Sequence, residues 1–241
     1  MIMGMPVIIE IVDITAKDED IEEIFSDFRK IDERFSPYKE TSEVMLINRG
    51  KLARGDYSQE MNKIIALAEE TKHATNGFFT TTIRGLFDPS GIVKGYAIWE
   101  AAKKLEKRGY ENFFVEIGGD IQIKGVSSSG SKWVVGIRNP FQTDEIIKVL
   151  SLTNCGIATS GTYLRGSHIY NPVSGVNATD IASITVIGKN VYEADRFATA
   201  AFAMGENGIS FIQSKQYLEA YMITNNERAY FTEGFSKFVQ M

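Results

Sequence analysis

The chain contains very little cysteine and histidine, which limits the chemistry open to it. One cysteine, Cys155, and two histidines occur among 241 residues. A single cysteine cannot form an intrachain disulfide, and no histidine–cysteine cluster has the spacing of a zinc site. Cys155 lies in an apolar run with no histidine near it in the sequence, so we expect a small buried core residue rather than a catalytic thiol.

Long apolar runs and an excess of basic residues are absent as well. No apolar run reaches the ~18 residues of a membrane-spanning helix. The first 14 residues lack the basic start and cleavage site of a signal peptide and alternate like a strand. The net charge is −5 and the two signs are interspersed, which argues against a nucleic-acid-binding protein. We expect a soluble cytoplasmic protein, although a chain trimmed of an export signal would show the same pattern.

Hydrophobic residues make up 44% of the chain, enough for a sizeable core. No repeat, low-complexity tract or linker is visible, so we expect a single domain spanning residues 1–241. Apolar periodicity predicts helices at residues 18–35, 42–48, 58–74, 95–108 and 191–204. It predicts strands at residues 7–14, 113–117, 121–125, 132–137, 146–152, 156–160, 162–169, 182–187, 218–223 and 229–231, with a hairpin loop at 126–131. This order indicates an α+β fold with helices packed on mainly antiparallel sheets.

A first functional pattern surrounds a lysine flanked by glycines. Asp88 is placed to cap the following turn, and Gly91 and Gly95 allow close backbone approach. Lys94 puts a positive charge near the start of a helix, where an anionic ligand would relieve its repulsion with the helix dipole. Further on, Asp120 ends a Gly-Gly-Asp turn. The pattern fits a site for a phosphate-bearing ligand and a metal, and it equally fits an ordinary capped helix with an exposed lysine.

Two further patterns carry candidate chemistry. Asp195 and Thr199 are four residues apart, so on a helix they share one face and offer the hard oxygens that Mg²⁺ prefers. The alternative is an acidic residue favouring the helix dipole and a threonine bonded to its own backbone. His168 precedes an Asn-Pro turn and is either a general base or a structural side chain. No nucleophile elbow accompanies it.

Taken in order, these segments resemble the ApbE family, the FAD:protein FMN transferases. The matching stretches cover nearly the whole chain: Met-Gly-Met at 3–5, Phe-Ser-Pro-Tyr at 35–38 with Ser-Glu at 42–43 and Ile-Asn at 47–48, Thr-Asn-Gly-Phe-Phe at 75–79, GIVKGYA at 91–97, GGDI at 118–121, WVVGI at 133–137 with Pro140, ATSGTY at 158–163, HIYNPVSG at 168–175, SITVIG at 183–188 and ADRFATA at 194–200. Each stretch alone is a weak signal, but the ordered set is specific.

The resemblance implies a fold related to the T-fold and a Mg²⁺-dependent reaction. In that reaction FMN passes from FAD to a threonine or serine hydroxyl of a target flavoprotein, and AMP is released. By position, the metal ligands would be Asp195, Thr199 and the backbone carbonyl of Gly91. The FAD contacts would be Met3, Tyr38, Phe78, Phe79, Thr80, Asp88, Lys94 and Ile169. Either His168 or Asp120 would accept the proton of the attacking hydroxyl.

The chain departs from the family pattern in three places. The family usually has Phe-Asp-Pro and a long insertion after the glycine at 77, whereas here only seven residues separate Thr80 from Asp88. Glu116 and Ile117 precede the Gly-Gly-Asp turn, where an amide or small polar residue is common. No lipobox is present, which points to a cytoplasmic acceptor.

Two other readings stay open at this stage. The protein could be an FAD pyrophosphatase that releases FMN and AMP, or a flavin-binding protein without catalysis, which the shortened loop supports. Paired strands and sheet edges would permit a homodimer.

Overall fold

The computed structural model describes residues 1–162 and 169–240. Its helices are α1 (Asp18–Phe35), α2 (Glu43–Asn48), α3 (Gln59–Ala74), α4 (Ser90–Lys107), α5 (Val191–Ala203) and α6 (Asn207–Gln213), with short 3₁₀ turns η1 (Arg54–Asp56) and η2 (Phe235–Phe238). Its strands are β1 (Val7–Ile11), β2 (Thr82–Ile83), β3 (Leu86–Phe87), β4 (Phe113–Ile117), β5 (Asp120–Lys124), β6 (Trp133–Arg138), β7 (Ile146–Leu152), β8 (Cys155–Gly161), β9 (Tyr170–Asn171), β10 (Val176–Asn177), β11 (Ile181–Gly188), β12 (Glu219–Thr224) and β13 (Ala229–Phe231).

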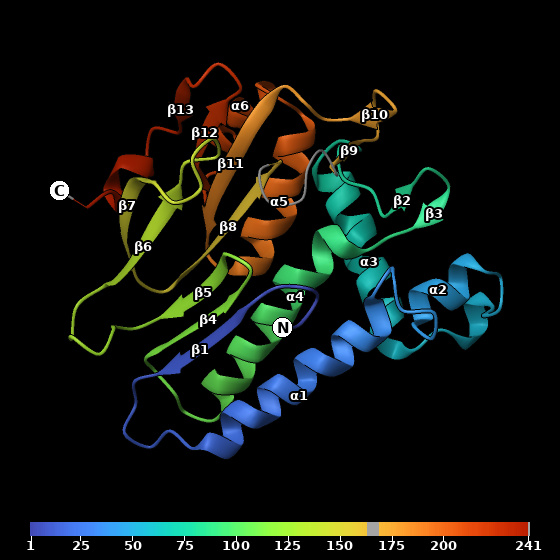
Figure 1. The fold of residues 1–241 in the computed structure, drawn as a ribbon, viewed down its shortest axis with the longest axis horizontal. Coiled ribbons are helices and arrows are strands. Elements are labelled where there is room, and N and C mark those ends of the chain that lie inside the picture. Colours follow the sequence, from blue (N-terminus) through green and yellow to red (C-terminus); the bar gives the residue numbers. More distant parts are fainter. Residues whose placement is uncertain (163–168, 241) are drawn as a thin grey trace.

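A seven-stranded sheet organises the molecule (Figure 1). Its strand order is β1-β4-β5-β8-β11-β12-β13, and every neighbouring pair is antiparallel. Strands β6 and β7 form a separate two-stranded sheet, as do β2 with β3 and β9 with β10. This arrangement confirms the predicted α+β class with mainly antiparallel sheets.

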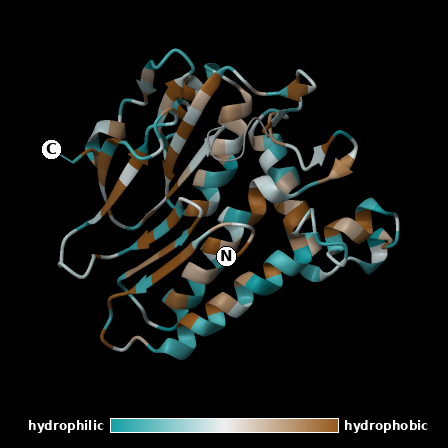
Figure 2. Ribbon diagram, in the orientation of Figure 1, coloured by the Kyte–Doolittle hydropathy of each residue, from teal (hydrophilic) through white to brown (hydrophobic). Residues whose placement is uncertain are grey.

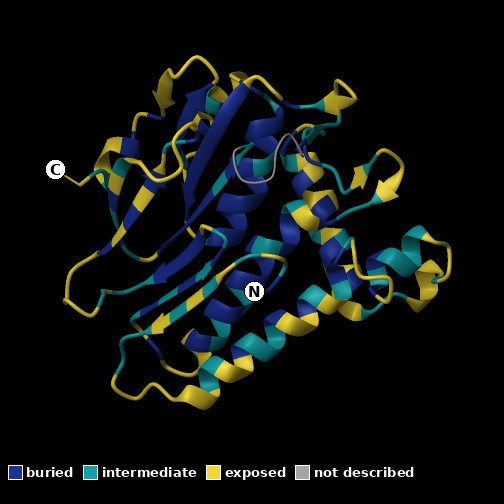
Figure 3. Ribbon diagram, in the orientation of Figure 1, coloured by how far each residue is buried: buried dark blue, intermediate teal, exposed yellow. Residues whose placement is uncertain are grey.

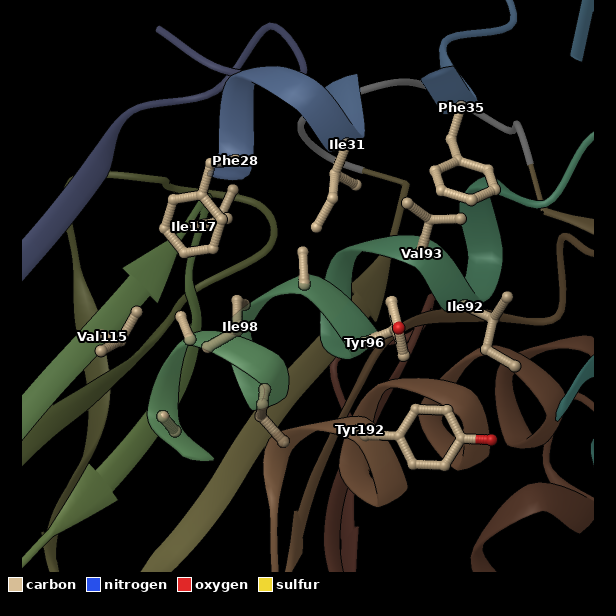
Figure 4. Close-up of a cluster of buried hydrophobic side chains, with 14 of the residues drawn as sticks. Phe28, Ile31, Phe35, Ile92, Val93, Tyr96, Ile98, Val115, Ile117 and Tyr192 are labelled. Carbon is tan, nitrogen blue, oxygen red and sulfur yellow. The ribbon is translucent and has the colours of Figure 1, made fainter. Parts of the chain in front are cut away.

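Helix α4 lies between the sheet and α1 (Figure 4). Phe28, Ile31 and Phe35 of α1 point toward α4 from one side, and Val115 and Ile117 of β4 approach it from the sheet. These α1 residues recur at three- and four-residue intervals, so they form one apolar stripe on the helix. The rest of α1 is largely hydrophilic and faces outward (Figure 2). Burial of this stripe therefore fixes α4 against the sheet.

Helix α5 packs on the same sheet beside α4, and it is buried along almost its whole length (Figure 3). Its neighbours β8 and β11 are also strongly buried. A helix that is buried on every side belongs to the centre of a domain rather than to its surface. Polar residues on α5 must therefore find partners inside the protein.

The opposite face of the sheet is covered by β6 and β7. Ile121 and Ile123 of β5 share a hydrophobic cluster with Trp133 and Leu150 of this small sheet. Side chains alternate along β5, so Gln122, which lies between these isoleucines, faces the helices instead. Strand β5 is consequently the place where a buried polar residue can reach α4 and α5.

Several expected boundaries were wrong. Helix α4 begins at Ser90 rather than at residue 95, because Ile92 and Val93 bury their side chains and offset the low helix propensity of two glycines. Strand β1 ends at Ile11 rather than at residue 14. Residues 126–131 do not close a hairpin, since β5 and β6 belong to different sheets; the loop carries the chain from one sheet to the other.

The strand expected at residues 162–169 stays a prediction over most of its length. Strand β8 ends at Gly161, neither Thr162 nor Ile169 lies in a strand, and residues 163–168 lie outside the described residues. Helix α6 and the short hairpins β2–β3 and β9–β10 were not anticipated. Cys155 is buried as expected, and His73 is an exposed residue of α3.

Within the residues that the structure describes, no helix combines the length and apolar character needed to cross a membrane.

Candidate functional site

The glycine-flanked lysine and the Gly-Gly-Asp turn meet in the folded protein. Lys94 of α4 places its Nζ 2.7 Å from Oδ2 of Asp120 at the start of β5. The Asp120 side chain is only 1% exposed, whereas Lys94 keeps 18% exposure. The other Asp120 oxygen, Oδ1, accepts a hydrogen bond from the backbone N–H of Thr159 on β8 at 3.1 Å. Asp120 is thus fixed by two strands and a helix, and Lys94 is held at the edge of solvent.

A second buried carboxyl, Asp195 of α5, lies beside this ion pair. Its Oδ2 accepts the backbone N–H of Gly95 at 2.7 Å, which joins α5 to α4. Burial of the Asp195 carboxyl, together with the neighbouring Asp120 carboxylate, raises the Asp195 pKa from 3.8 to about 8, against the opposing effect of Lys94. Two carboxyls and one ammonium therefore share a small, nearly dry volume, and the raised pKa means that Asp195 is largely protonated at neutral pH.

Glycine allows α4 and α5 to approach this closely. A Cβ on Gly95 would lie 2.6 Å from Cβ of Asp195, a distance that real Cβ atoms do not adopt, and 3.0 Å from the carbonyl oxygen of Val191, which is a tight contact. At the start of α5, a Cβ on Gly156 of β8 would lie 1.9 Å from the backbone nitrogen of Val191. Both glycines are required by contacts between distant segments rather than by their own backbone angles.

Gln122 of β5 fixes the beginning of α5. Its Oε1 accepts the N–H of Val191 at 2.8 Å, and its Nε2 donates to the carbonyl of Cys155 at 3.1 Å. Asn190 supplies the usual side-chain cap, accepting the N–H of Glu193 at 2.9 Å. Two side chains thus satisfy the first free N–H groups of α5, and this sets the helix that carries Asp195 and Thr199.

The proposed metal-binding residues come together across α4 and α5. The Thr199 hydroxyl lies 3.5 Å from the carbonyl oxygen of Gly91, a long separation for a hydrogen bond. A Cβ on Gly91 would be 3.3 Å from both Cε2 of Phe79 and Cγ2 of Thr199, so these three residues are in close contact. Asp195 lies one helical turn before Thr199 on the same helix. The structure therefore brings together residues that are about a hundred positions apart.

The oxygens of these residues are of the kinds that a small divalent cation binds. They belong to one carboxylate, one hydroxyl and one carbonyl, and Mg²⁺ commonly completes such a set with phosphate oxygens of its ligand. The raised pKa keeps a proton on Asp195 near neutral pH, and a cation bound there would replace that proton and favour the ionised carboxylate. Among the described residues, no three side chains of His, Cys, Asp or Glu gather into a metal-binding group, so a cation here would depend on the neutral oxygens.

Met3 is placed near this site by a tight turn. The backbones of Ile2 and Met5 pair with each other, and Met3 has a positive φ of 52°. The Met5 side chain packs over Gly118, where a Cβ would lie 2.4 Å from the Met5 sulfur. The N-terminal turn therefore rests on the Gly-Gly turn that leads directly into Asp120.

Tyr38 presents an exposed aromatic ring just after α1. The ring is 88% exposed, an unusual state for a large apolar side chain. The turn that carries it is well ordered internally: Oγ of buried Ser36 accepts the N–H groups of Tyr38 and Lys39, both at 3.2 Å, and the Ser42 hydroxyl donates to the Ser36 carbonyl at 2.6 Å. An exposed ring on a fixed turn is available to stack on a planar ligand.

The remaining expected flavin contacts lie around the ends of α3 and α4. Phe79 is buried with its ring in the core, so contact with a ligand would have to come from its backbone. Phe78 and Ile169 belong to one hydrophobic cluster. Thr80 is half-buried just before β2. Asp88 accepts the N–H of Ser90 at 2.9 Å and so closes the turn at the start of α4.

The short loop between Thr80 and Asp88 is a small hairpin pinned to α2. Asn48 accepts the N–H of Phe87 at 2.7 Å and donates to its carbonyl at 2.9 Å, as a neighbouring strand would. Leu86 of this hairpin is 56% exposed. The segment is therefore fixed in position, although it is much shorter than the family pattern led us to expect.

His168 lies outside the described residues, so its expected role stays a prediction. Sequence reasoning assigned no task to Gln122, Asn48 or Arg196, all of which hold the site together. Gln122 could have been suspected from its pattern, because a polar residue between two isoleucines of a buried strand needs an internal partner. Asn48 carried no such signal.

Comparison with known proteins identifies the family of this chain. The sequence profile of the ApbE family matches residues 3–89 and 84–222. Among relatives, an FAD:protein FMN transferase of Haemophilus influenzae is 33% identical over 165 residues, covering 64% of this chain and 48% of the relative. One of Vibrio cholerae is 30% identical over 165 residues, covering 63% and 49%. The chain thus spans about half the length of these curated relatives.

Solved structures show the same fold over the whole chain. The flavin transferase ApbE from Vibrio cholerae superposes with a TM-score of 0.85 and 23% identity, covering 99% of this chain and 97% of that one. The ApbE protein of Thermotoga maritima gives a TM-score of 0.88 and 22% identity, covering 100% and 98%. At this identity the likeness establishes the fold alone. Together with the profile match, which covers most of the sequence, it shows that this chain belongs to the ApbE family.

Proposed function

We propose that the protein transfers FMN from FAD to a serine or threonine hydroxyl of a target flavoprotein, with Mg²⁺ as the required cation and AMP as the second product. The proposal is supported by relatives named FAD:protein FMN transferase. The observation that carries it is the meeting of Lys94, Asp195 and Thr199 around the start of α4, where a charged ammonium, a buried carboxyl and neutral oxygens converge.

Binding of FAD divides into two parts under this proposal. The diphosphate lies at the start of α4, where Lys94 is partly exposed and the positive end of the helix dipole favours negative charge. The flavin and adenine rings need apolar or aromatic surfaces, for which the exposed Tyr38 ring and the segment around Phe78 are available. Met3 belongs to the N-terminal turn whose Met5 packs on Gly118 of the Gly-Gly turn, and under this proposal it contacts FAD there.

The reaction breaks one bond and makes one bond. The acceptor hydroxyl oxygen attacks the phosphorus of the FMN half, the bond from that phosphorus to the bridging oxygen breaks, and AMP leaves with the bridging oxygen. Bound Mg²⁺ would supply neutralisation of charge on the phosphate oxygens, held by Asp195, Thr199 and the Gly91 carbonyl. Lys94 contributes a second positive charge at the same place, and Asp120 holds Lys94 there.

The hydroxyl proton goes to His168 or to Asp120. Asp120 is 1% exposed and both of its oxygens are engaged, one with Lys94 and one with the N–H of Thr159. These contacts suit a residue that positions Lys94 better than one that receives a proton from a protein substrate. Comparing His168→Ala with Asp120→Asn separates the two: loss of the base lowers kcat and removes the rising limb of the pH profile, whereas loss of positioning raises KM for FAD.

The test of the proposal uses purified protein, FAD and a flavoprotein that serves as the acceptor of one of the relatives named FAD:protein FMN transferase. With Mg²⁺ we expect the acceptor to gain the mass of one FMN and AMP to appear in equal amount. With EDTA we expect neither product. An unmodified acceptor in the presence of Mg²⁺ would contradict the proposal; release of free FMN and AMP without acceptor would identify a pyrophosphatase, and bound FAD without turnover would identify a flavin-binding protein.

A further inference from the structure

Arg196 is a buried cation one residue beyond Asp195, and it faces α3 rather than the candidate metal site. Its side chain is 6% exposed. One terminal nitrogen donates to both carboxylate oxygens of Glu193, at 2.8 and 2.9 Å. The other donates to the hydroxyl of Thr71 at 3.1 Å and to Oε1 of the exposed Glu70 at 3.3 Å. The guanidinium also lies 5.0 Å and 4.7 Å from the ring centres of Tyr192 and Phe197. Removing an ion pair from water is costly, so its presence on the helix that carries Asp195 calls for an explanation.

Thr71 of α3 connects Arg196 to the segment from Phe78 to Thr80, which is expected to contact FAD. Its hydroxyl donates to the carbonyl of Leu67 at 2.7 Å while accepting from Arg196. Its own carbonyl accepts the hydroxyl of Thr75 at 2.8 Å, and that hydroxyl accepts the N–H of Phe79 at 3.2 Å. Thr71 and Thr75 are fully buried. A continuous set of hydrogen bonds therefore runs from Arg196 to the backbone of Phe79.

Phe79 connects these hydrogen bonds to the candidate metal site. Its ring and the methyl group of Thr199 are both in contact with the Cα side of Gly91, each 3.3 Å from where a Cβ would stand. Thr199 belongs to α5, one turn beyond Arg196. These contacts thus begin at Arg196 and end at Thr199, both on α5, and they pass through α3 and the start of α4. A shift of α3 would move Phe79, and with it the segment from Phe78 to Thr80, relative to the metal-binding oxygens.

We propose that Arg196, acting through Thr71, is a positioning residue that holds the Phe78–Thr80 segment at a fixed distance from the oxygens of Gly91 and Thr199. The inference rests on the proposed function, because it assumes that this segment contacts FAD. Arg196 itself touches no substrate. Its guanidinium can hold Glu193 and Thr71 at once, which a lysine cannot do with the same geometry. The predicted consequence of breaking the contact is weaker FAD binding with the phosphoryl-transfer step preserved.

The test compares Thr71→Val, which removes the hydroxyl at nearly constant volume, with Thr71→Ser, which retains it. A hydrogen bond to a charged group contributes about tenfold in an equilibrium constant. We therefore expect Thr71→Val to raise both KM for FAD and the dissociation constant of FAD by about fivefold to tenfold. We expect kcat at saturating FAD to stay within about twofold, and Thr71→Ser to restore wild-type values.

A double-mutant cycle supplies the second readout. Arg196→Lys keeps the positive charge beside Glu193 but loses the second guanidinium nitrogen that donates to Thr71. The double variant Arg196→Lys/Thr71→Val should therefore bind FAD no more weakly than the weaker-binding single variant. Folding of each variant is checked by thermal unfolding, and rates are scaled to the folded fraction. Wild-type FAD affinity in folded Thr71→Val, additive effects, or equal losses in Thr71→Val and Thr71→Ser would overturn the inference.

The measurement of FAD binding also distinguishes failure of this inference from failure of the proposed function. FAD binding is measured by quenching of flavin fluorescence without acceptor protein. If the wild type binds FAD but transfers no FMN, the proposed function fails while the comparison of Thr71→Val with Thr71→Ser still decides the role of Arg196. If the wild type does not bind FAD, both are overturned.

Discussion

Replacing Gly95 with alanine would place a methyl group where α4 meets α5. The added Cβ would lie 2.6 Å from Cβ and 2.9 Å from Oδ2 of Asp195, and 3.0 Å from the Val191 carbonyl. Cβ and backbone atoms cannot rotate away as the tip of a flexible side chain can. The contact must therefore be relieved by moving α5 away from α4, which also lengthens the 2.7 Å hydrogen bond from the Gly95 N–H to Asp195.

Two opposing effects set the size of the stability change. Forcing an extra carbon into a packed contact costs about 1–3 kcal/mol, and the upper part of this range applies because rigid atoms are involved. Replacing glycine with alanine within a helix raises the free energy of unfolding by about 1 kcal/mol. We therefore expect Gly95→Ala to lose about 1–2 kcal/mol of unfolding free energy. Displacing Asp195 by about 1 Å relative to Gly91 would lower the rate of FMN transfer by about 100-fold.

The assay pairs denaturant unfolding with initial rates of AMP release from FAD in the presence of acceptor and Mg²⁺. Gly55→Ala is the matched control, because Gly55 lies in the short turn η1 with no atom within 4 Å of an added Cβ. We expect the control to keep wild-type stability and rate. A Gly95→Ala protein with wild-type activity and stability would refute the claim that the close approach of α4 and α5 places Asp195.

Three further predictions follow from the same geometry. Asp120→Asn keeps an acceptor for the N–H of Thr159 but releases Lys94, so we expect KM for FAD to rise by about tenfold in steady-state assays; an unchanged KM would show that Lys94 needs no partner. Burial raises the pKa of the Cys155 thiol to about 11, so iodoacetamide at pH 8 should label it only after unfolding, and labelling of the native protein would contradict its buried position. Asn48→Ala removes both hydrogen bonds to Phe87 and should lower the free energy of unfolding, measured with denaturant, by about 1–3 kcal/mol. An unchanged free energy would show that other contacts hold the hairpin.

Local patterns predicted much of the fold. The apolar stripe of α1 was readable because its buried residues recur with helical spacing and no glycine interrupts them. The start of α4 was misplaced for the opposite reason. Gly91 and Gly95 lower local helix propensity, and the compensating burial of Ile92 and Val93 depends on α1 and on the other helices around them. Propensity describes a segment in isolation, and here tertiary packing prevails.

The candidate site divides in the same way. Lys94 and Asp120 could be placed near each other from the helix–strand order, because a short connection between α4 and β4 brings the Gly-Gly-Asp turn back toward the helix. The pairing of α4 with α5 could not be foreseen from spacing alone, since Gly95 and Asp195 are a hundred positions apart and their contact depends on a missing Cβ. The resemblance to a family supplied that pairing, and physical reasoning from local sequence did not.

The role of Asn48 shows a further limit. Its amide replaces a strand beside Phe87, yet nothing in its local sequence distinguishes it from an ordinary residue at the end of a short helix. Arg196 and Glu193 are three residues apart and would pass for an exposed helical ion pair. Only the burial of α5 on all sides shows that they lie inside the protein.

The most direct test of the account is the intact mass of an acceptor flavoprotein after incubation with FAD, Mg²⁺ and either the wild type or Asp195→Asn. The amide keeps an acceptor for the Gly95 N–H and resembles the protonated carboxyl that the raised Asp195 pKa favours, so the variant should fold about as well as the wild type. Asp144→Asn, at an exposed position, is the matched control. The account predicts one added FMN with the wild type and the control and none with Asp195→Asn; full FMN addition by a folded Asp195→Asn protein would contradict it.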